Sequence, residues 1–218
     1  MMFAEILFGA FIFGFASADC NANQQAAILQ CYAPYLQYYG VNSQPGMLPD
    51  LQTLANAMQQ KFDQLGQQAA KDLCDHATPL SQCLAKVMSP IDLDCFMQLT
   101  GNKTDDSYGY MEDIAVHNYE CGAGYKVFVQ EFYCMEGVQK NQATLLQQCQ
   151  DDLNKNLQNG MPVCQAYDTY ISCESVVLAR YCDYNAGVFY CNVLRVALDS
   201  VYNVCDNQHQ LTPCPDYH

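Results

Sequence analysis

Residues 163–182 read VCQAYDTYISCESVVLARYC, and this stretch decides the fold class. Its apolar side chains recur at steps of three and four residues, which is the period of an amphipathic α-helix. The apolar stripe consists of Val163, Ala166, Tyr167, Tyr170, Ile171, Val177, Leu178 and Tyr181. Cys164, Cys173 and Cys182 follow one another at nine-residue steps, roughly 13 Å along a helix, which exceeds the reach of a disulfide. We therefore expect this helix to be bonded to two different neighbours.

The same helical period appears along most of the chain, whereas the alternating pattern of half-buried strands is nearly absent. One long helix is expected from Pro49-Asp50 to Cys74, and a second is expected to open at Thr78-Pro79 and stop at Pro90. Further helices are expected over residues 126–136, 142–157, 163–182 and 187–205. The sequence therefore predicts an all-α, disulfide-stapled multi-helix bundle.

A weak internal repeat, or echo, of one cysteine spacing bears on the domain organisation. The spacing Cys74-x8-Cys83 returns as Cys164-x8-Cys173, and an aromatic, glycine-containing segment follows each pair. Duplication of a helical unit produces such an echo, although the intervening segments do not keep one fixed period. The hypothesis that follows is a cysteine-rich helical domain over residues 19–218, with two related halves at 19–115 and 116–218.

The cysteines indicate an oxidising compartment. Their number is even, and the closest two are separated by eight residues, whereas zinc sites use pairs separated by two to four. We therefore predict disulfide bonds for all fourteen: Cys20, Cys31, Cys74, Cys83, Cys95, Cys121, Cys134, Cys149, Cys164, Cys173, Cys182, Cys191, Cys205 and Cys214.

The first residues predict secretion. Residues 1–15 form an apolar run, and Ala16-Ser17-Ala18 matches the small-residue cleavage pattern of a signal peptide over residues 1–18. A membrane anchor is the alternative, but Glu5 interrupts the run before it reaches the required length. No second long apolar stretch follows, so no membrane span and an extracellular location are expected.

The formal net charge of −14 limits the partners. An acidic surface repels nucleic-acid phosphates and anionic lipid headgroups, and it favours basic partners or cations. No nucleic-acid partner is expected. Phosphate-binding glycine loops are missing as well, so the sequence predicts no cofactor.

The segment GNKTDDSYG, residues 101–109, is polar and bounded by glycines, so an exposed loop is expected there. It contains the acceptor sequence Asn102-Lys103-Thr104, which predicts an N-glycan at Asn102. A calcium loop is an alternative because acidic residues cluster before Glu112 and Asp113, but the spacing does not match an EF-hand. Solvated charge is the interpretation we favour for these carboxylates.

Catalytic patterns are weak. The histidines His76, His117, His209 and His218 form no zinc-protease arrangement, and the G-x-S-x-G elbow of hydrolases is missing. Cys74-Asp75-His76 is superficially similar to secreted phospholipases A2, but the adjacent cysteine pair and the calcium-binding glycine loop of that family are missing. We therefore predict no enzymatic activity, and a hydrolase using His76 or His117 is the weakest hypothesis.

Two features allow both a functional and a structural interpretation. Glu174 falls inside the apolar stripe of residues 163–182, where it is either a functional carboxylate with a raised pKa or the partner of Arg180, Arg195 or a tyrosine hydroxyl. Tyrosines cluster at Tyr32, Tyr35, Tyr38 and Tyr39, where they either line a pocket or pack into the core with their hydroxyls at its rim. For the tyrosines we favour the core.

The C-x8-C-x8-C spacing and YECGAGYKVF, residues 119–128, resemble the cysteine-rich helical domains of unknown function in secreted nematode proteins. In style they also resemble the cysteine-rich domain of nematode chondroitin proteoglycans. The resemblance implies an extracellular, disulfide-bonded helical domain. The Cys-Gly step of such domains occurs at Cys121-Gly122 but becomes Cys182-Asp183 in the second half, and no Ser-Gly dipeptide offers a glycosaminoglycan attachment site.

Two functions remain in view for the predicted secreted protein. The first is a non-enzymatic binding or structural protein with an extracellular protein partner. The second is a carrier whose helices enclose a lipid or other apolar ligand. An enclosed apolar cavity would favour the carrier, a filled core would favour the binding protein, and a carboxylate beside a histidine in an open cleft would favour the hydrolase.

Overall fold

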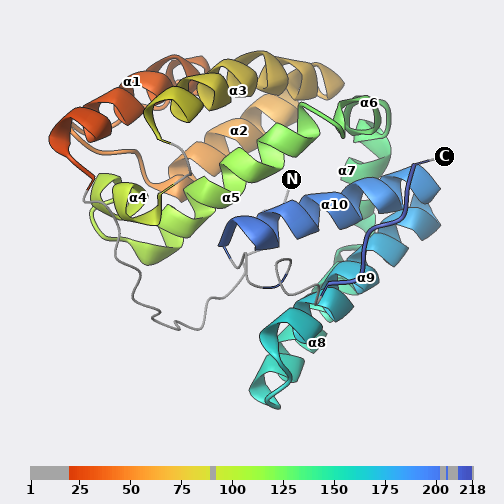
Figure 1. The fold of residues 1–218 in the computed structure, drawn as a ribbon. Coiled ribbons are helices and arrows are strands. Elements are labelled where there is room, and N and C mark those ends of the chain that lie inside the picture. Colours follow the sequence, from red (N-terminus) through yellow and green to blue (C-terminus); the bar gives the residue numbers. More distant parts are fainter. Residues whose placement is uncertain (1–19, 89–91, 202–204, 206–210, 218) are drawn as a thin grey trace. The chain divides into compact units, whose positions relative to one another are not determined.

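A computed structural model describes residues 20–88, 92–201, 205 and 211–217. These residues form ten α-helices and no strand (Figure 1). The predicted all-α, disulfide-stapled class is therefore confirmed. The predicted signal peptide, the stop at Pro90, His209 and His218 lie outside the described residues. Across the described ranges, no helix has both the length and the hydropathy needed to cross a bilayer.

The chain divides into two compact units, one reaching to Ile114 and the other starting at Ala115. They are named the N-terminal unit and the C-terminal unit below. The boundary falls within α5, Thr104–Glu120. A common origin of the two units by duplication stays a prediction.

The N-terminal unit contains α1, α2, α3, α4 and the first part of α5. The bounds of the first four helices are Ala22–Tyr39, Leu51–Leu65, Gln67–Val87 and Leu93–Leu99. Helices α1, α2 and α3 pack against one another and run side by side in Figure 1. Their apolar faces form the core, with fully buried side chains that include Ile28, Leu54, Met58, Leu73, Leu84 and Leu99.

The predicted break between a helix ending at Cys74 and another opening at Thr78-Pro79 is wrong. Helix α2 ends at Leu65, and α3 continues from Gln67 through Thr78-Pro79 without interruption. Gly66 separates them because its φ of 58° is an angle that glycine adopts at little cost. Pro79 is tolerated within α3 because it lies on the exposed side, where water can replace the missing backbone hydrogen bond.

The predicted loop over residues 101–109 is also largely wrong, because α5 starts at Thr104. Asp105 and Asp106 lie in its first turn, where carboxylates stabilise the positive end of the helix dipole. Gly109 serves close packing, since an added Cβ would lie 2.1 Å from Leu51 Cδ2 on α2. The glycine that seemed to bound a loop thus allows α5 to approach α2.

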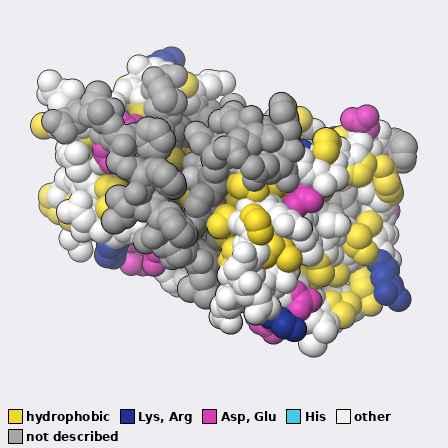
Figure 2. Space-filling view, turned by 60° about the horizontal axis from the view of Figure 1, so that its bottom comes forward, with side chains coloured by type: hydrophobic (Ala, Val, Ile, Leu, Met, Phe, Trp, Pro, Cys, Tyr) yellow, Lys and Arg dark blue, Asp and Glu magenta, His cyan; other side chains and the backbone are white. Residues whose placement is uncertain are grey.

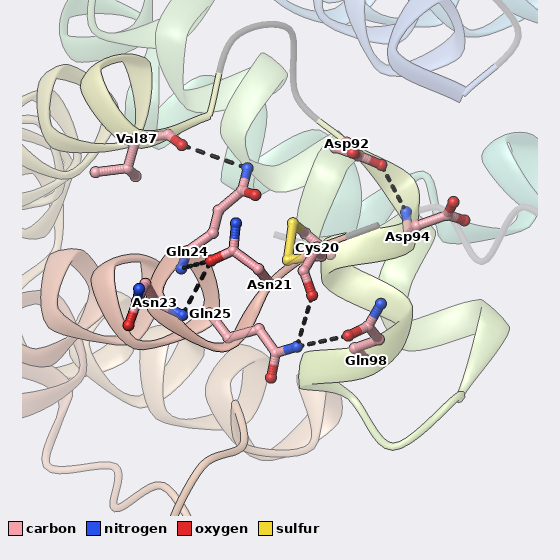
Figure 3. The surroundings of a disulfide bond; sticks show 10 residues. Cys20, Asn21, Asn23, Gln24, Gln25, Val87, Asp92, Asp94 and Gln98 are labelled. Carbon is pink, nitrogen blue, oxygen red and sulfur yellow. Dashed lines mark hydrogen bonds between the residues drawn. A yellow bond between two sulfur atoms is a disulfide. The ribbon is translucent and has the colours of Figure 1, made fainter. Parts of the chain in front are cut away.

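A disulfide holds the start of α1 against α4 (Figure 3). Cys20 is bonded to Cys95, with 5.0 Å between their Cα atoms. The Asn21 side chain caps α1 by accepting from two backbone N–H groups. Gln25 donates through Nε2 to the Cys20 carbonyl, 3.0 Å away, and to the Gln98 side chain on α4. The start of α1 is therefore held against α4 by a disulfide and by hydrogen bonds.

The C-terminal unit contains α6 to α10. Their bounds are Tyr125–Gln130, Phe132–Asn141, Ala143–Gln158, Val163–Tyr181 and Tyr184–Val201. Helix α9 packs against α7, α8 and α10. The predicted helices over 142–157 and 163–182 match α8 and α9 closely, whereas the one over 126–136 is divided at Glu131 into α6 and α7.

Three disulfides attach α9 to its surroundings. Cys164 is bonded to Cys205, Cys173 to Cys149 on α8, and Cys182 to Cys134 on α7. The expectation that this helix is bonded to different neighbours is thus confirmed, with three partner segments instead of two. Cys31 is bonded to Cys83 and Cys191 to Cys214, and no free cysteine is present.

Candidate functional site

Among the described residues, the large aromatic side chains that are exposed are all tyrosines, and they lie in the C-terminal unit. The phenylalanines of the described residues are buried: Phe62, Phe96, Phe128, Phe132 and Phe189. The exposed tyrosines are Tyr125, Tyr133, Tyr181, Tyr184 and Tyr217. In Figure 2, hydrophobic side chains gather in the right half of the visible face, with acidic and basic side chains at their margins. Large exposed apolar side chains concentrated in one part of a protein indicate an interaction surface.

Three of these tyrosines lie within two residues of one disulfide. Tyr133 precedes Cys134, Tyr181 precedes Cys182, and Tyr184 begins α10 two residues later. The Cα atoms of the two cysteines are 5.7 Å apart, so the flanking segments are close in space. Tyr133, Tyr181 and Tyr184 are named the tyrosine patch below. Tyr133 is the most exposed large apolar side chain of the described residues, at 65 %.

The backbone beneath the patch is fixed. Asp183 lies between Cys182 and Tyr184, and its Oδ1 accepts the backbone N–H of Ala186 at 2.8 Å, which caps α10. The Cys134 sulfur lies 3.5 Å from the Tyr181 carbonyl oxygen. The segment between α9 and α10 is thus held by the Cys182 disulfide and by the Asp183 cap. Binding to a segment that is already ordered costs less conformational entropy.

Charged groups of both signs surround the patch. The Arg180 guanidinium lies over the Tyr181 ring, 5.6 Å from its centroid. Burial and the nearby Asp183 carboxylate both raise the pKa of Glu131. Phenol rings, one guanidinium and two carboxylates therefore share this surface, and tyrosine and arginine are the residue types that dominate binding energy at protein interfaces.

Glu174, the carboxylate that looked out of place in the sequence, is buried in the C-terminal unit with 5 % exposure. Its carboxyl group forms hydrogen bonds with the hydroxyls of Tyr170 and Tyr190. Burial raises its pKa to about 7, and these two hydrogen bonds oppose the rise. Tyrosine hydroxyls are thus its partners, one of the structural arrangements considered above.

A histidine and a carboxylate do lie together, but in the core. His117 Nε2 is 3.9 Å from a Glu120 carboxylate oxygen, and the two side chains are only 4 % and 1 % exposed. Burial lowers the pKa of His117 to about 3, so the imidazole is neutral at physiological pH. The open cleft that a hydrolase would require does not surround this pair. His117 and Glu120 are three residues apart on α5, and this helical spacing was the signal that the sequence offered.

The N-terminal unit contains a second buried acidic group. Asp113 is 2 % exposed, and burial raises its pKa to about 7. The pKa of Glu112 also rises to about 7, through burial and the neighbouring Asp113. The interpretation as solvated charge therefore fits Asp105, which is exposed, and does not extend to Asp113, which is buried. The short polar segment before them starts a helix, and the helix turns Asp113 toward buried tyrosines.

The tyrosine cluster of α1 mainly packs into the core, as expected. Tyr32, Tyr35 and Tyr39 are buried, and the Tyr32 ring contacts Phe96 and Tyr110 edge-on. Tyr38 lies nearer the surface, where its hydroxyl donates to Asp72 at 2.9 Å and its ring stacks on His76 at 3.9 Å. His76 is thus engaged in an aromatic stack on this surface.

Among the described residues, no group of three or more histidine, cysteine, aspartate or glutamate side chains could hold a metal ion. Asn102 lies in an exposed turn with a φ of 64°. Lys103, the next residue, contacts Asp50 at 2.9 Å and Asp106 at 3.4 Å. The glycan acceptor predicted from the sequence is therefore at the surface.

No protein-family model, curated protein or solved structure matches this chain. The resemblance to secreted nematode proteins and the expected lack of enzymatic activity and of cofactors therefore stay predictions. The function has to be argued from the surface and the core described above.

Proposed function

We propose that this protein acts outside the cell as a rigid, non-enzymatic binding protein, and that the tyrosine patch is its binding surface. The observation that carries the proposal is the exposure of Tyr133, Tyr181 and Tyr184 around the Cys134–Cys182 disulfide. Tyrosine provides a large contact area with few rotatable bonds, which makes it efficient at interfaces. Complete oxidation of the cysteines supports an extracellular environment.

The core of the N-terminal unit favours binding over the carrier function. Its centre is occupied by aromatic rings in mutual contact, with Tyr32, Tyr110 and Phe96 pairwise 5.6–6.4 Å apart between centroids. A carrier of apolar molecules needs enclosed space between such side chains. Ring-to-ring packing fills that space with the protein's own atoms.

The proposal is tested by retention on extracellular material from the tissue that secretes the protein. The triple variant Tyr133→Ser, Tyr181→Ser, Tyr184→Ser is compared with the wild type and with Tyr125→Ser, which removes an exposed tyrosine outside the patch. We expect the wild type and Tyr125→Ser to be retained and the triple variant to be washed off. Equal retention of all three proteins, with equal melting temperatures, would contradict the proposed binding surface.

The exposed position of Asn102 supports a glycan there. We expect the secreted protein to lose mass on treatment with an N-glycosidase, and the variant Asn102→Gln to show no such loss. An unchanged mass of the wild type after treatment would refute the glycan. The result of this glycan test does not bear on the tyrosine patch, which is tested by the retention experiment.

A further inference from the structure

The chemistry of the tyrosine patch also indicates what it binds, provided that the proposed binding function holds. The C-terminal unit carries eleven acidic residues against five basic ones. Two acidic residues are next to the patch along the chain, since Glu131 precedes Tyr133 by two residues and Asp183 lies between Cys182 and Tyr184. A positive charge placed between them would be attracted by both carboxylates.

Tyrosine rings of this protein already accept cations. Lys61 Nζ lies 4.7 Å from the centroid of the Tyr38 ring, and the Arg180 guanidinium lies 5.6 Å from that of Tyr181. Such contacts stabilise a cation over the electron-rich face of the ring. Tyr133 has 65 % of its surface open to solvent, so a cation from outside can reach it in the same way.

We propose that the tyrosine patch binds a cationic segment of a partner polypeptide, with lysine or arginine side chains over the phenol rings and beside the Glu131 and Asp183 carboxylates. A polypeptide fits better than a polyanion or a membrane, because the net charge of −14 repels both. Backbone ordered by the disulfide and the Asp183 cap presents these groups in a fixed arrangement.

The test is calorimetric titration of the oxidised, full-length secreted protein with a flexible arginine-containing peptide. A second peptide carries citrulline at each arginine, which keeps the shape and removes the charge. We expect the arginine peptide to bind at least tenfold more tightly, with an affinity that falls as salt concentration rises. Equal affinity for the two peptides would overturn the proposal.

Matched variants distinguish the contribution of the phenol rings to binding from that of the carboxylate charges. The double variant Tyr133→Phe, Tyr184→Phe keeps the rings and should bind the arginine peptide within about twofold of the wild type, whereas Tyr133→Ser, Tyr184→Ser should lose at least tenfold. The double variant Glu131→Gln, Asp183→Asn removes both charges, and asparagine can still cap α10. This variant should bind the arginine peptide more weakly than the wild type and prefer it less over the citrulline peptide, with the remaining preference due to the rings.

Other ligands give outcomes that can be told apart. Binding of a neutral oligosaccharide that is lost in the double serine variant, together with no preference for arginine over citrulline, would identify a carbohydrate surface and overturn the inference. If the triple serine variant is washed off extracellular material but the arginine peptide does not bind the wild type, the proposed function stands and the cationic partner is wrong. Equal retention of wild type and variant would instead refute the proposed function itself.

Discussion

The two units differ in the exposure of their tyrosines, since the exposed ones among the described residues all lie in the C-terminal unit, which also buries Tyr167 and Tyr170. In the N-terminal unit Tyr32, Tyr35 and Tyr110 are at most 1 % exposed, and they contact other rings in the core. In the C-terminal unit Tyr133 and Tyr184 are 65 % and 43 % exposed. A residue with an apolar ring and a polar hydroxyl suits both positions. Under the binding function proposed above, exposed tyrosines of the second unit contact a partner, whereas the buried ones of the first unit contribute to stability.

The disulfides, by contrast, follow one plan in both units. Cys31–Cys83 lies within the span of Cys20–Cys95, and Cys149–Cys173 lies within the span of Cys134–Cys182. In each unit a further cysteine precedes the inner bond's second cysteine by nine residues. Nested bonds at such related positions are what duplication of a cysteine-rich helical unit would produce. A shared pair of nested bonds with different tyrosine exposure would then reflect specialisation of one copy for binding.

The largest expected effect comes from removing the inner bond of either unit. The sequence separations are 52 residues for Cys31–Cys83 and 24 for Cys149–Cys173. Because a longer loop restricts the unfolded chain more, Cys31→Ala, Cys83→Ala should lose about 4 kcal/mol, and Cys149→Ala, Cys173→Ala about 3 kcal/mol. Guanidinium denaturation under non-reducing conditions measures both. A larger loss for the C-terminal pair would show that the two inner bonds are not equivalent.

The next effect concerns acidity, and it should differ between the units. The pKa of Asp113 rises from 3.8 to about 7 on folding, so the stability from its protonated form is complete below about pH 4 and is lost as the pH rises toward 7. In the C-terminal unit Glu174, whose pKa also rises to about 7, behaves likewise. His117 acts in the opposite direction, because its pKa falls to about 3 and its contribution is lost as the pH falls from 6.5.

We therefore expect a pH rise from 4.5 to 7.5 to destabilise the N-terminal unit more than the C-terminal unit, by an amount on the order of a few kcal/mol. Hydrogen exchange, corrected for the intrinsic rate, reports α1–α3 and α8–α10 separately. Asp113→Asn should flatten the pH dependence in α1–α3 and leave that of α8–α10 unchanged. A pH dependence of α1–α3 that is identical in wild type and variant would contradict the role of Asp113.

These residues also show how far the sequence can be used for prediction. The period of the apolar stripe sufficed for α8 and α9, and it placed Glu174 on a buried face, because both depend on local spacing. The burial of Asp113 could not be predicted because it depends on tyrosines from another helix, α1, and local polarity gives no sign of that contact. The tyrosine patch was missed for the same reason: Tyr133-Cys134 and Tyr190-Cys191 look alike in sequence, yet only Tyr133 is exposed.

A smaller effect is expected at one glycine in each unit. At Gly187 on α10 an added Cβ would lie 2.8 Å from the Ser175 carbonyl oxygen and 2.6 Å from Ala179 Cβ, so backbone of α9 would have to move. At Gly109 the obstacle is the end of the flexible Leu51 side chain. Gly187→Ala should therefore cost about 2 kcal/mol, and Gly109→Ala should be near neutral because a helix-propensity gain of about 1 kcal/mol offsets the rearrangement of Leu51.

Gly137 on α7 provides the control, since only the Asn141 side chain comes within 4.0 Å of an added Cβ. Gly137→Ala should raise the free energy of unfolding by about 1 kcal/mol through helix propensity alone. Thermal melts of the three variants rank them directly. If Gly109→Ala were as damaging as Gly187→Ala, close helix packing would be equally rigid in the two units.

The smallest expected effect on stability comes from removing a cation that lies over a tyrosine ring. The same two substitutions should distinguish the binding surface from the rest of the protein. Lys61 over Tyr38 and Arg180 over Tyr181 are similar surface contacts, and replacing either cation by methionine should change the free energy of unfolding by only about 0.5–1 kcal/mol. Their effects on binding should differ. Arg180→Met frees the Tyr181 ring for a partner's cation, so affinity for the arginine peptide should rise roughly two- to fivefold, whereas Lys61→Met should leave it unchanged. Weaker binding by Arg180→Met would mean that Arg180 itself contacts the partner, and the partner would then have to present a negative group to this surface.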